Sequence, residues 1–198
     1  MKPELHLFDF DGTITSKDSL LNFAQFVVGP IRSKCYMALI VPVISLMKLG
    51  VLKRANVKVM FLRLNFKGLS KDRLSNLAQE YLERSTNNQL FRPKALEKIR
   101  DLRQEGHRIC IVSASLDIWL RPIADYFQAD LLCTKAEIIS DKFTGNLTGK
   151  NCNFNEKAIR IRANYDLSNF SKVVAYGDSK GDQAMFDMAD EHFFRPFN

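Results

Sequence analysis

The sequence has few of the residues that build disulfide frameworks or zinc sites. Among 198 residues there are four cysteines and three histidines, and no two cysteines form a C-x-x-C pair. Neither residue type clusters at ligand spacing, which argues against a zinc site. Three of the cysteines lie in or beside apolar runs, a pattern typical of reduced, buried thiols in a cytosolic protein.

Long apolar segments are also scarce. The N-terminus leads directly into a strand-like segment and has no apolar signal-peptide core. The apolar run at residues 37–47 is shorter than the roughly 18–20 residues of a membrane span, Pro42 interrupts it, and Lys34 and Lys48 bracket it. We therefore expect a cytoplasmic protein in which this run forms a buried or interfacial pair of helices. Peripheral association with an anionic membrane is the open alternative.

The charge of the chain is strongly uneven. The net charge is +7, and residues 14–90 hold 12 Lys/Arg against 4 Asp/Glu, whereas the rest holds 17 against 18. A basic segment that contains the apolar run suits an anionic surface, although a solvated face explains the same composition. The segment has no exposed-aromatic pattern or reading motif, so we expect no nucleic-acid partner.

Short apolar runs alternate with helical periodicity along most of the chain, which predicts an α/β fold with a parallel sheet. A long helical region at about residues 17–85 follows the first strand, with breaks at 29–30, 50 and 68–70. Residues 142–149 predict a hairpin that turns at Gly145 and Asn146. The other strands are expected at residues 5–10, 108–113, 130–134, 172–176 and 192–195, and the later helices at 93–105, 118–127, 155–164 and 182–189.

Carboxylates and hydroxyls stand where the predicted strands end. The first strand ends at Asp9 and Asp11, the second at Ser113 and Ser115, and the fourth at Asp178, with Asp182 shortly after. Because parallel strands bring their carboxyl ends to one edge, these side chains are expected to converge there.

Converging carboxylates repel one another unless a cation or a proton lies among them. With only oxygen ligands, Mg²⁺ is the expected ion. Such a site suits phosphoryl transfer, in which one carboxylate attacks phosphorus and a second acid moves the proton. A lysine is needed to hold the nucleophile and the phosphate together, and Lys157 and Lys150 are the candidates.

These residues resemble the four motifs of the haloacid dehalogenase-like (HAD) superfamily in its phosphatase form. The motifs are Asp-Phe-Asp-Gly-Thr at residues 9–13, Val-Ser-Ala-Ser at 112–115, Lys157, and Gly-Asp-Ser-Lys-Gly-Asp at 177–182. They stand in the family's order, and the resemblance covers essentially the whole chain. It implies a Rossmann-like parallel sheet, formed by residues 1–15 and 86–198. It also implies an inserted all-helical cap at residues 16–85, as in the phosphoserine phosphatase-like subfamily IB.

The resemblance also implies the roles of the site residues. Asp9 is expected to be the nucleophile and a metal ligand, and Asp11 the general acid/base that also offers its carbonyl to the metal. Lys157 is expected to hold the phosphate. The remaining candidates are Thr13, Ser113 and the N–H of Ala114 for the phosphate, and Asp178 and Asp182 for the metal.

Two departures from the phosphoserine phosphatase pattern concern the substrate. Those enzymes carry a Glu in the segment that enters the cap, where this chain has Asp18. Their second motif runs Ser-Gly-Gly, where this chain has Ser-Ala-Ser. Asp18 is a candidate substrate contact, with capping of the first cap helix as the alternative.

Two functions of different classes follow. The first is an Mg²⁺-dependent phosphomonoester phosphatase with an aspartyl-phosphate intermediate. Its substrate is a small phosphate ester or the phosphate of a lipid head group such as phosphatidylglycerophosphate. The second is a peripheral membrane-binding module with a vestigial catalytic site. The apolar cap is also a candidate homodimer interface.

Overall fold

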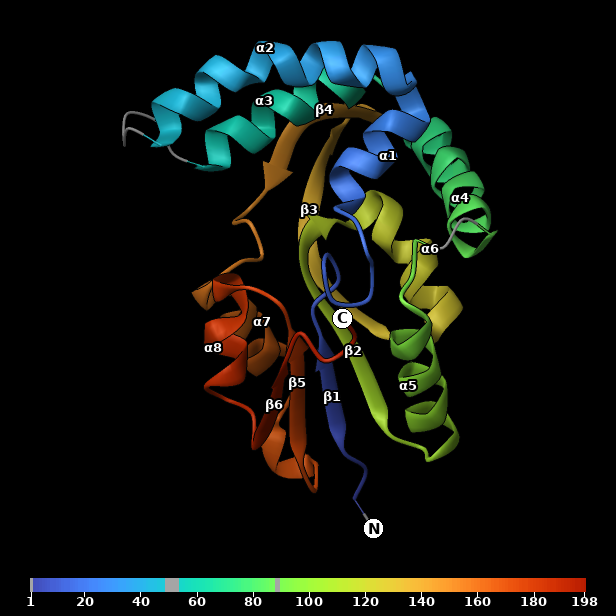
Figure 1. The fold of residues 1–198 in the computed structure, drawn as a ribbon, viewed down its shortest axis with the longest axis vertical. Helices are drawn as coiled ribbons and strands as arrows, with labels where there is room; N and C mark the ends of the chain where they lie inside the picture. Colours follow the sequence, from blue (N-terminus) through green and yellow to red (C-terminus); the bar gives the residue numbers. More distant parts are fainter. Residues whose placement is uncertain (1, 49–53, 88–89) are drawn as a thin grey trace.

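The computed structural model describes residues 2–48, 54–87 and 90–198. They form a six-stranded sheet in the order β4-β3-β2-β1-β5-β6, covered by helices on both faces (Figure 1). All neighbouring strands are parallel except β3 and β4, so the predicted parallel α/β fold is confirmed. The strands are β1 (Leu5–Phe8), β2 (Arg108–Leu116), β3 (Asp130–Ile139), β4 (Lys142–Thr148), β5 (Val173–Gly177) and β6 (Glu191–Phe194).

The central strand, β1, is short, and its one polar side chain, His6, lies at hydrogen-bond distance from Glu4 and from the Tyr176 hydroxyl. All four residues of β1 are buried, because helices cover both faces of the sheet at this point. The helices are α1 (Ser19–Val28), α2 (Pro30–Lys48), α3 (Arg54–Phe66), α4 (Lys71–Asn87), α5 (Pro93–Gln104), α6 (Asp117–Phe127), α7 (Asn155–Asn164) and α8 (Gln183–Phe186). The buried apolar side chains form two clusters. The larger cluster includes side chains of α1, α4, α5 and α6, and the smaller cluster includes side chains of α7 and α8.

The predicted hairpin at residues 142–149 is wrong. Residues Ser140 and Asp141, both with positive φ, make the turn, and β4 runs straight through Gly145 as the antiparallel partner of β3. Gly145 serves a close approach instead of a turn, because a Cβ there would lie 2.3 Å from Cγ of Arg63 in α3. The prediction failed because a glycine required by packing has the same local appearance as one required by a turn.

Helices α1 to α4 lie beyond the carboxyl end of the sheet, with α2 as the outermost layer over α3 (Figure 1). Breaks occur at Gly29 and at residues 67–70, as expected, while Gly50 lies outside the described residues. Pro42 does not interrupt α2, which continues through it to Lys48. The domain boundaries at residues 15/16 and 85/86 stay a prediction.

None of the described helices has the length and apolar content of a membrane span. Within the apolar run, Ile40 is buried and Leu39 is exposed, so its described side chains lie partly in the interior and partly at the surface. Three of the four cysteines are buried, and Cys35, on α2, is exposed.

Candidate active site

Lys157 forms the centre of a buried ionic cluster at the carboxyl edge of the sheet. Its ammonium group donates to Asp9 Oδ1 over 2.5 Å and to Asp182 Oδ1 over 2.6 Å, and all three side chains are buried. Burial alone would lower the pKa of Lys157, but the attraction of the two carboxylates outweighs it and raises that pKa above its ordinary value. The lysine is therefore charged at every physiological pH.

Backbone hydrogen bonds between segments distant in sequence bring these residues together. The N–H of Asp9 bonds to the carbonyl of Tyr176 on β5, which holds Asp9 at the end of β1. Lys157 stands in the first turn of α7, and the start of that helix is tied to the loop of Asp182 by the bond from Phe154 N–H to the Gly181 carbonyl. Lys157 thus reaches Asp9 from the helix that precedes β5.

Asp182 uses both of its oxygens within the protein. Oδ1 accepts from Lys157, and Oδ2 accepts from the N–H and the hydroxyl of Ser179, at 3.0 and 2.9 Å. Ser179 and Asp182 form a reciprocal capping box around a turn of 3₁₀ helix at Lys180–Asp182. Asp182 also precedes α8, but its side chain makes no capping bond to that helix. Its bonds to Lys157 and Ser179 are compatible with a place beside a metal.

Asp178 completes a set of three carboxylates. Oxygens of Asp9, Asp178 and Asp182 lie within 4.8 Å of one another. Burial, reinforced by Asp182, raises the pKa of Asp178. The carboxylate of Asp178 lies close to the backbone of Gly12, where only a glycine leaves room for it. Gly12 has a φ of +86°, and a Cβ at this position would lie 2.4 Å from Asp178 Oδ2.

This donor set suits a hard divalent cation. It offers carboxylate oxygens only, as Mg²⁺ prefers, and no sulfur or imidazole. Burial raises the pKa of Asp9 to about 7, with Asp182 adding to the effect and Lys157 opposing it. A cation beside Asp9 and Asp178 would offset the burial of these carboxylates and their mutual repulsion. Asp11 is not part of the side-chain cluster, and only its carbonyl remains as a predicted ligand.

Asp11 faces away from the cluster, toward the start of α1. Its Oδ1 accepts the N–H of Ser19 at 2.6 Å, and its Oδ2 accepts the hydroxyl of Ser115 at 2.5 Å. Ser19 in turn accepts a bond from the indole N–H of Trp119 at 3.0 Å. Burial, with the charge of Asp18, raises the pKa of Asp11 to about 6. A carboxyl group with this pKa can hold and release a proton near neutral pH.

The predicted phosphate donors lie at the ends of β1 and β2. The register of β2 against β3 shifts after Ser113, where the N–H of Ser115 bonds back to the Ser113 hydroxyl at 3.0 Å. Thr13 is buried, and its hydroxyl has no hydrogen-bond partner among the described residues. An orphaned hydroxyl in the segment that carries Asp9 and Asp11 is what an anionic oxygen at this place would satisfy.

A cavity of about 410 Å³ opens onto Asp11. Lys58 of α3 enters it and donates to the Ala114 carbonyl at 2.5 Å and to Asn151 Oδ1 at 2.6 Å. Burial lowers the pKa of Lys58 to about 8, although Asp11 and Asp18 pull the other way. The cavity is lined by Asp11, Asp18, Leu20, Lys58, Ala114, Ser115, Asn151, Asn153 and Phe154.

Sequence reasoning missed Lys58. Helical spacing places it one turn before the buried Phe61 and Leu62, so a lysine on the inward face of α3 was the available signal. Asp18 takes the capping position of α1, where it accepts the N–H of Leu21 at 2.9 Å, and also lines the cavity. Lys150 is exposed, in contrast to Lys157.

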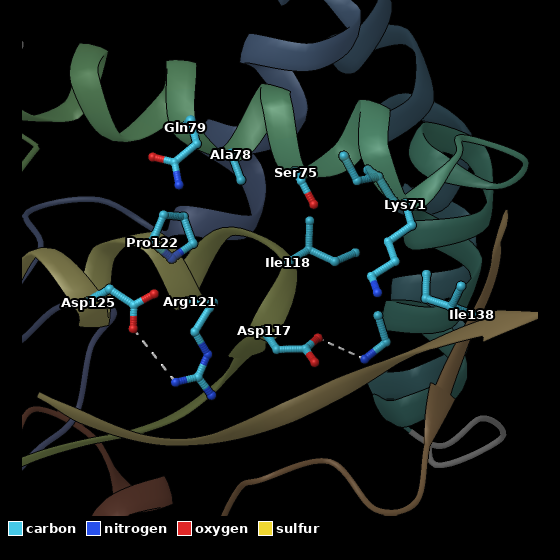
Figure 2. Close-up of a pocket in the computed structure, with 12 residues that line it drawn as sticks. Lys71, Ser75, Ala78, Gln79, Asp117, Ile118, Arg121, Pro122, Asp125 and Ile138 are labelled. Atoms are coloured by element: carbon cyan, nitrogen blue, oxygen red, sulfur yellow. Dashed lines mark hydrogen bonds and ion pairs between the residues drawn. The ribbon is translucent and has the colours of Figure 1, made fainter. Parts of the chain in front are cut away.

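A second cavity, of about 270 Å³, lies between α4 and α6 (Figure 2). Two of its charged side chains, Arg121 and Asp125, form an ion pair at 3.9 Å, and Asp117 accepts the N–H of Ala136 at 2.9 Å. It contains none of the strand-end residues and is therefore separate from the candidate active site.

Comparison with known proteins gives a consistent result. Residues 6–187 match the family described as haloacid dehalogenase-like hydrolase. The chain is 34% identical to Protein CicA of Caulobacter vibrioides, over 99% of this chain and 87% of that protein. It is 25% identical to a phosphoserine phosphatase of Methanocaldococcus jannaschii, over 95% of this chain and 83% of that protein. A solved phosphoserine phosphatase, in a phospho-aspartyl intermediate analogue, superposes with a TM-score of 0.68 at 20% identity, over 98% of this chain and 87% of that chain.

Proposed function

The chain belongs to the haloacid dehalogenase-like hydrolases, and from this premise we propose that it is an Mg²⁺-dependent phosphomonoester phosphatase. The observation that carries the proposal is the arrangement around Asp9. This carboxylate is held by Lys157, lies beside Asp178, and stands two residues from an acid that faces a cavity. The name of the phosphoserine phosphatase relative supports the same reaction class.

In the first step, an oxygen of Asp9 attacks phosphorus, and the bond from phosphorus to the ester oxygen breaks. Asp11 donates its proton to that departing oxygen, so the leaving group departs as a neutral alcohol. The charge of Lys157 stabilises the phosphoryl oxygens during the transfer. Thr13, Ser113 and the N–H of Ala114 supply hydrogen bonds to the same oxygens. The product of this step is an aspartyl-phosphate on Asp9.

In the second step, water attacks the phosphorus of the aspartyl-phosphate. Asp11, now ionised, takes a proton from the water, and the bond between phosphorus and Asp9 breaks. Inorganic phosphate leaves, and both carboxyl groups return to their starting states. Mg²⁺, held by Asp9, Asp178 and the carbonyl of Asp11 with Asp182 in support, would neutralise charge on the phosphoryl oxygens.

The cavity next to Asp11 suggests the class of substrate. The leaving group must occupy this space, because Asp11 protonates its oxygen. Lys58 brings a half-buried cation into that space. We infer that the leaving group carries an anionic group of its own, a carboxylate on a small ester or the phosphodiester of a lipid head group. Helices α1 to α4 would act as a cap that excludes water during the first step.

Phosphate release from a panel of monoesters tests the proposal. The panel holds p-nitrophenyl phosphate, phosphoserine, sugar phosphates and phosphatidylglycerophosphate, each with Mg²⁺ and with a chelator. We expect Mg²⁺-dependent turnover that falls roughly 10³-fold or more in Asp9→Asn. Turnover that persists in Asp9→Asn would exclude Asp9 as the nucleophile. No turnover by folded protein on any ester would favour the alternative of a vestigial site.

A further inference from the structure

The segment that contains α2 and α3 has an extreme charge composition. Between Asp18 and Asp72 there is no acidic residue, and nine lysines and arginines occur in the same stretch. No carboxylate within this stretch of sequence is therefore available to neutralise these cations. Such a segment attracts anionic partners and repels a second copy of itself.

The outer side of α2 is apolar and exposed. Ile31 is 80% exposed and Leu39 62% exposed, and Cys35 between them is also exposed. These three recur at intervals of four residues and so lie on one face of the helix. Ser33 and Ile40 are buried on the opposite side, toward the rest of the protein. Figure 1 shows α2 as the outermost layer, so this face has no covering element among the described residues.

Cations flank this apolar face on both sides. By helical geometry, Arg32 lies about 60° to one side of the line through the three apolar residues, and Lys34 about 100° to the other. Arg32 is directed along the helix, because its Nε donates to the Tyr36 hydroxyl at 2.7 Å and its guanidinium lies over the Tyr36 ring. We define the α2 face as Ile31, Arg32, Lys34, Cys35 and Leu39.

We propose that the α2 face docks the protein on an anionic phospholipid surface, with the helix axis parallel to the membrane. An apolar stripe flanked by cations buries its side chains at the head-group boundary while the charges meet anionic lipids. A nucleic acid would match the charge but would not take up exposed aliphatic side chains. A second copy would match the apolar stripe but would place like charges in contact.

Docking of the α2 face on a membrane does not itself depend on catalysis. Only its consequence for the substrate rests on the proposed function: docking would hold the enzyme near phosphate esters in the head-group layer. The experiment therefore measures binding and hydrolysis separately.

Co-sedimentation of the full chain with vesicles tests the docking. We compare phosphatidylcholine vesicles with vesicles that contain one third phosphatidylglycerol, at low and high salt. We expect binding to the anionic vesicles that weakens as salt screens the charges. Ile31→Ser/Leu39→Ser and Arg32→Gln/Lys34→Gln should each weaken it roughly tenfold or more. The matched control is Tyr126→Ser/Ile159→Ser, which removes two exposed apolar side chains on α6 and α7.

Three results would overturn the proposal. They are no binding to anionic vesicles at low salt, α2-face variants that bind like wild type, and equal loss in the control variant. Sedimentation velocity adds a fourth: a soluble dimer that Ile31→Ser/Leu39→Ser dissociates, without vesicle binding, would assign the face to a second copy.

Failure of the docking is distinguishable from failure of the phosphatase. Asp9→Asn should bind vesicles like wild type and hydrolyse nothing. The α2-face variants should hydrolyse soluble p-nitrophenyl phosphate at the wild-type rate. Wild-type protein that hydrolyses soluble esters without binding vesicles would refute the docking and leave the phosphatase in place.

Discussion

The carboxylate of Asp11 accepts the N–H of Ser19, the first residue of α1, at 2.6 Å. This bond joins the proposed proton donor to the positive end of the helix that begins the inserted region. The second oxygen of Asp11 accepts the hydroxyl of Ser115, at the end of β2. One acid thus connects the inserted helices with the edge of the sheet, and a change in its charge acts on both.

The raised pKa of Asp11 predicts a pH-dependent stability. Its folded pKa of about 6 exceeds the ordinary 3.8, so the folded protein binds this proton more tightly than the unfolded chain. The resulting stabilisation is fully present below about pH 4 and is lost as pH rises through 6. We expect Asp11→Asn to be more stable than wild type by about 1–3 kcal/mol at pH 7.5, and the difference to vanish near pH 4. Urea unfolding with a chelator present measures it, and a difference independent of pH would contradict the assignment.

Replacing Lys157 should affect both stability and catalysis. Lys157→Met leaves Asp9 and Asp182 buried without their cation, which we expect to cost about 3–5 kcal/mol and to abolish turnover. Lys150→Met, at an exposed position, should change stability by less than about 0.5 kcal/mol and leave turnover intact. Adding Asp182→Asn to Lys157→Met should recover part of the stability without activity. Loss of activity in Lys150→Met alone would make Lys150 the phosphate lysine.

Lys58 should set the preference for anionic leaving groups. We expect Lys58→Met to lower kcat/KM roughly 10–100-fold for esters with a charged leaving group, mainly through KM, and only slightly for p-nitrophenyl phosphate. Because the pKa of Lys58 is about 8, the wild-type preference should decline as pH rises through 8 and the amine loses its charge. Lys58→Arg should retain the preference above pH 8. Equal losses on charged and neutral esters would mean that Lys58 has only a structural role.

Gly12 should be required for the position of Asp178. In Gly12→Ala, the Cβ would clash with Asp178 Oδ2, and we expect the Mg²⁺ concentration for half-maximal activity to rise roughly tenfold or more. Gly68→Ala is the matched control, since Gly68 has a similar φ of +87° with nothing within 4 Å of its Cβ position. Both variants should lose about 1 kcal/mol from backbone strain. A normal Mg²⁺ requirement in Gly12→Ala would show that Asp178 tolerates displacement.

Much of the architecture could be predicted because it depends on local patterns. Helix 155–164 was predicted to the residue, and four of the parallel strands were placed to within three residues, whereas β3 continues five residues beyond its predicted end. The misplaced hairpin shows the limit of such reasoning. A glycine is needed at position 145 because Arg63, which is remote in sequence, packs closely against it. No local pattern distinguishes that glycine from a turn glycine.

By itself, the sequence determined the class of fold and the kinds of side chain at the sheet edge. Apolar periodicity places the strands, and parallel strands bring the residues that follow them to one edge. Only the tertiary structure decided which lysine reaches Asp9, how Asp11 and Asp182 use their oxygens, and that Lys58 enters the cavity beside Asp11. The physical reason is distance along the chain. Apart from the local bond between Ser179 and Asp182, these contacts join residues 25 to 148 positions apart, and they depend on how helices pack on the sheet.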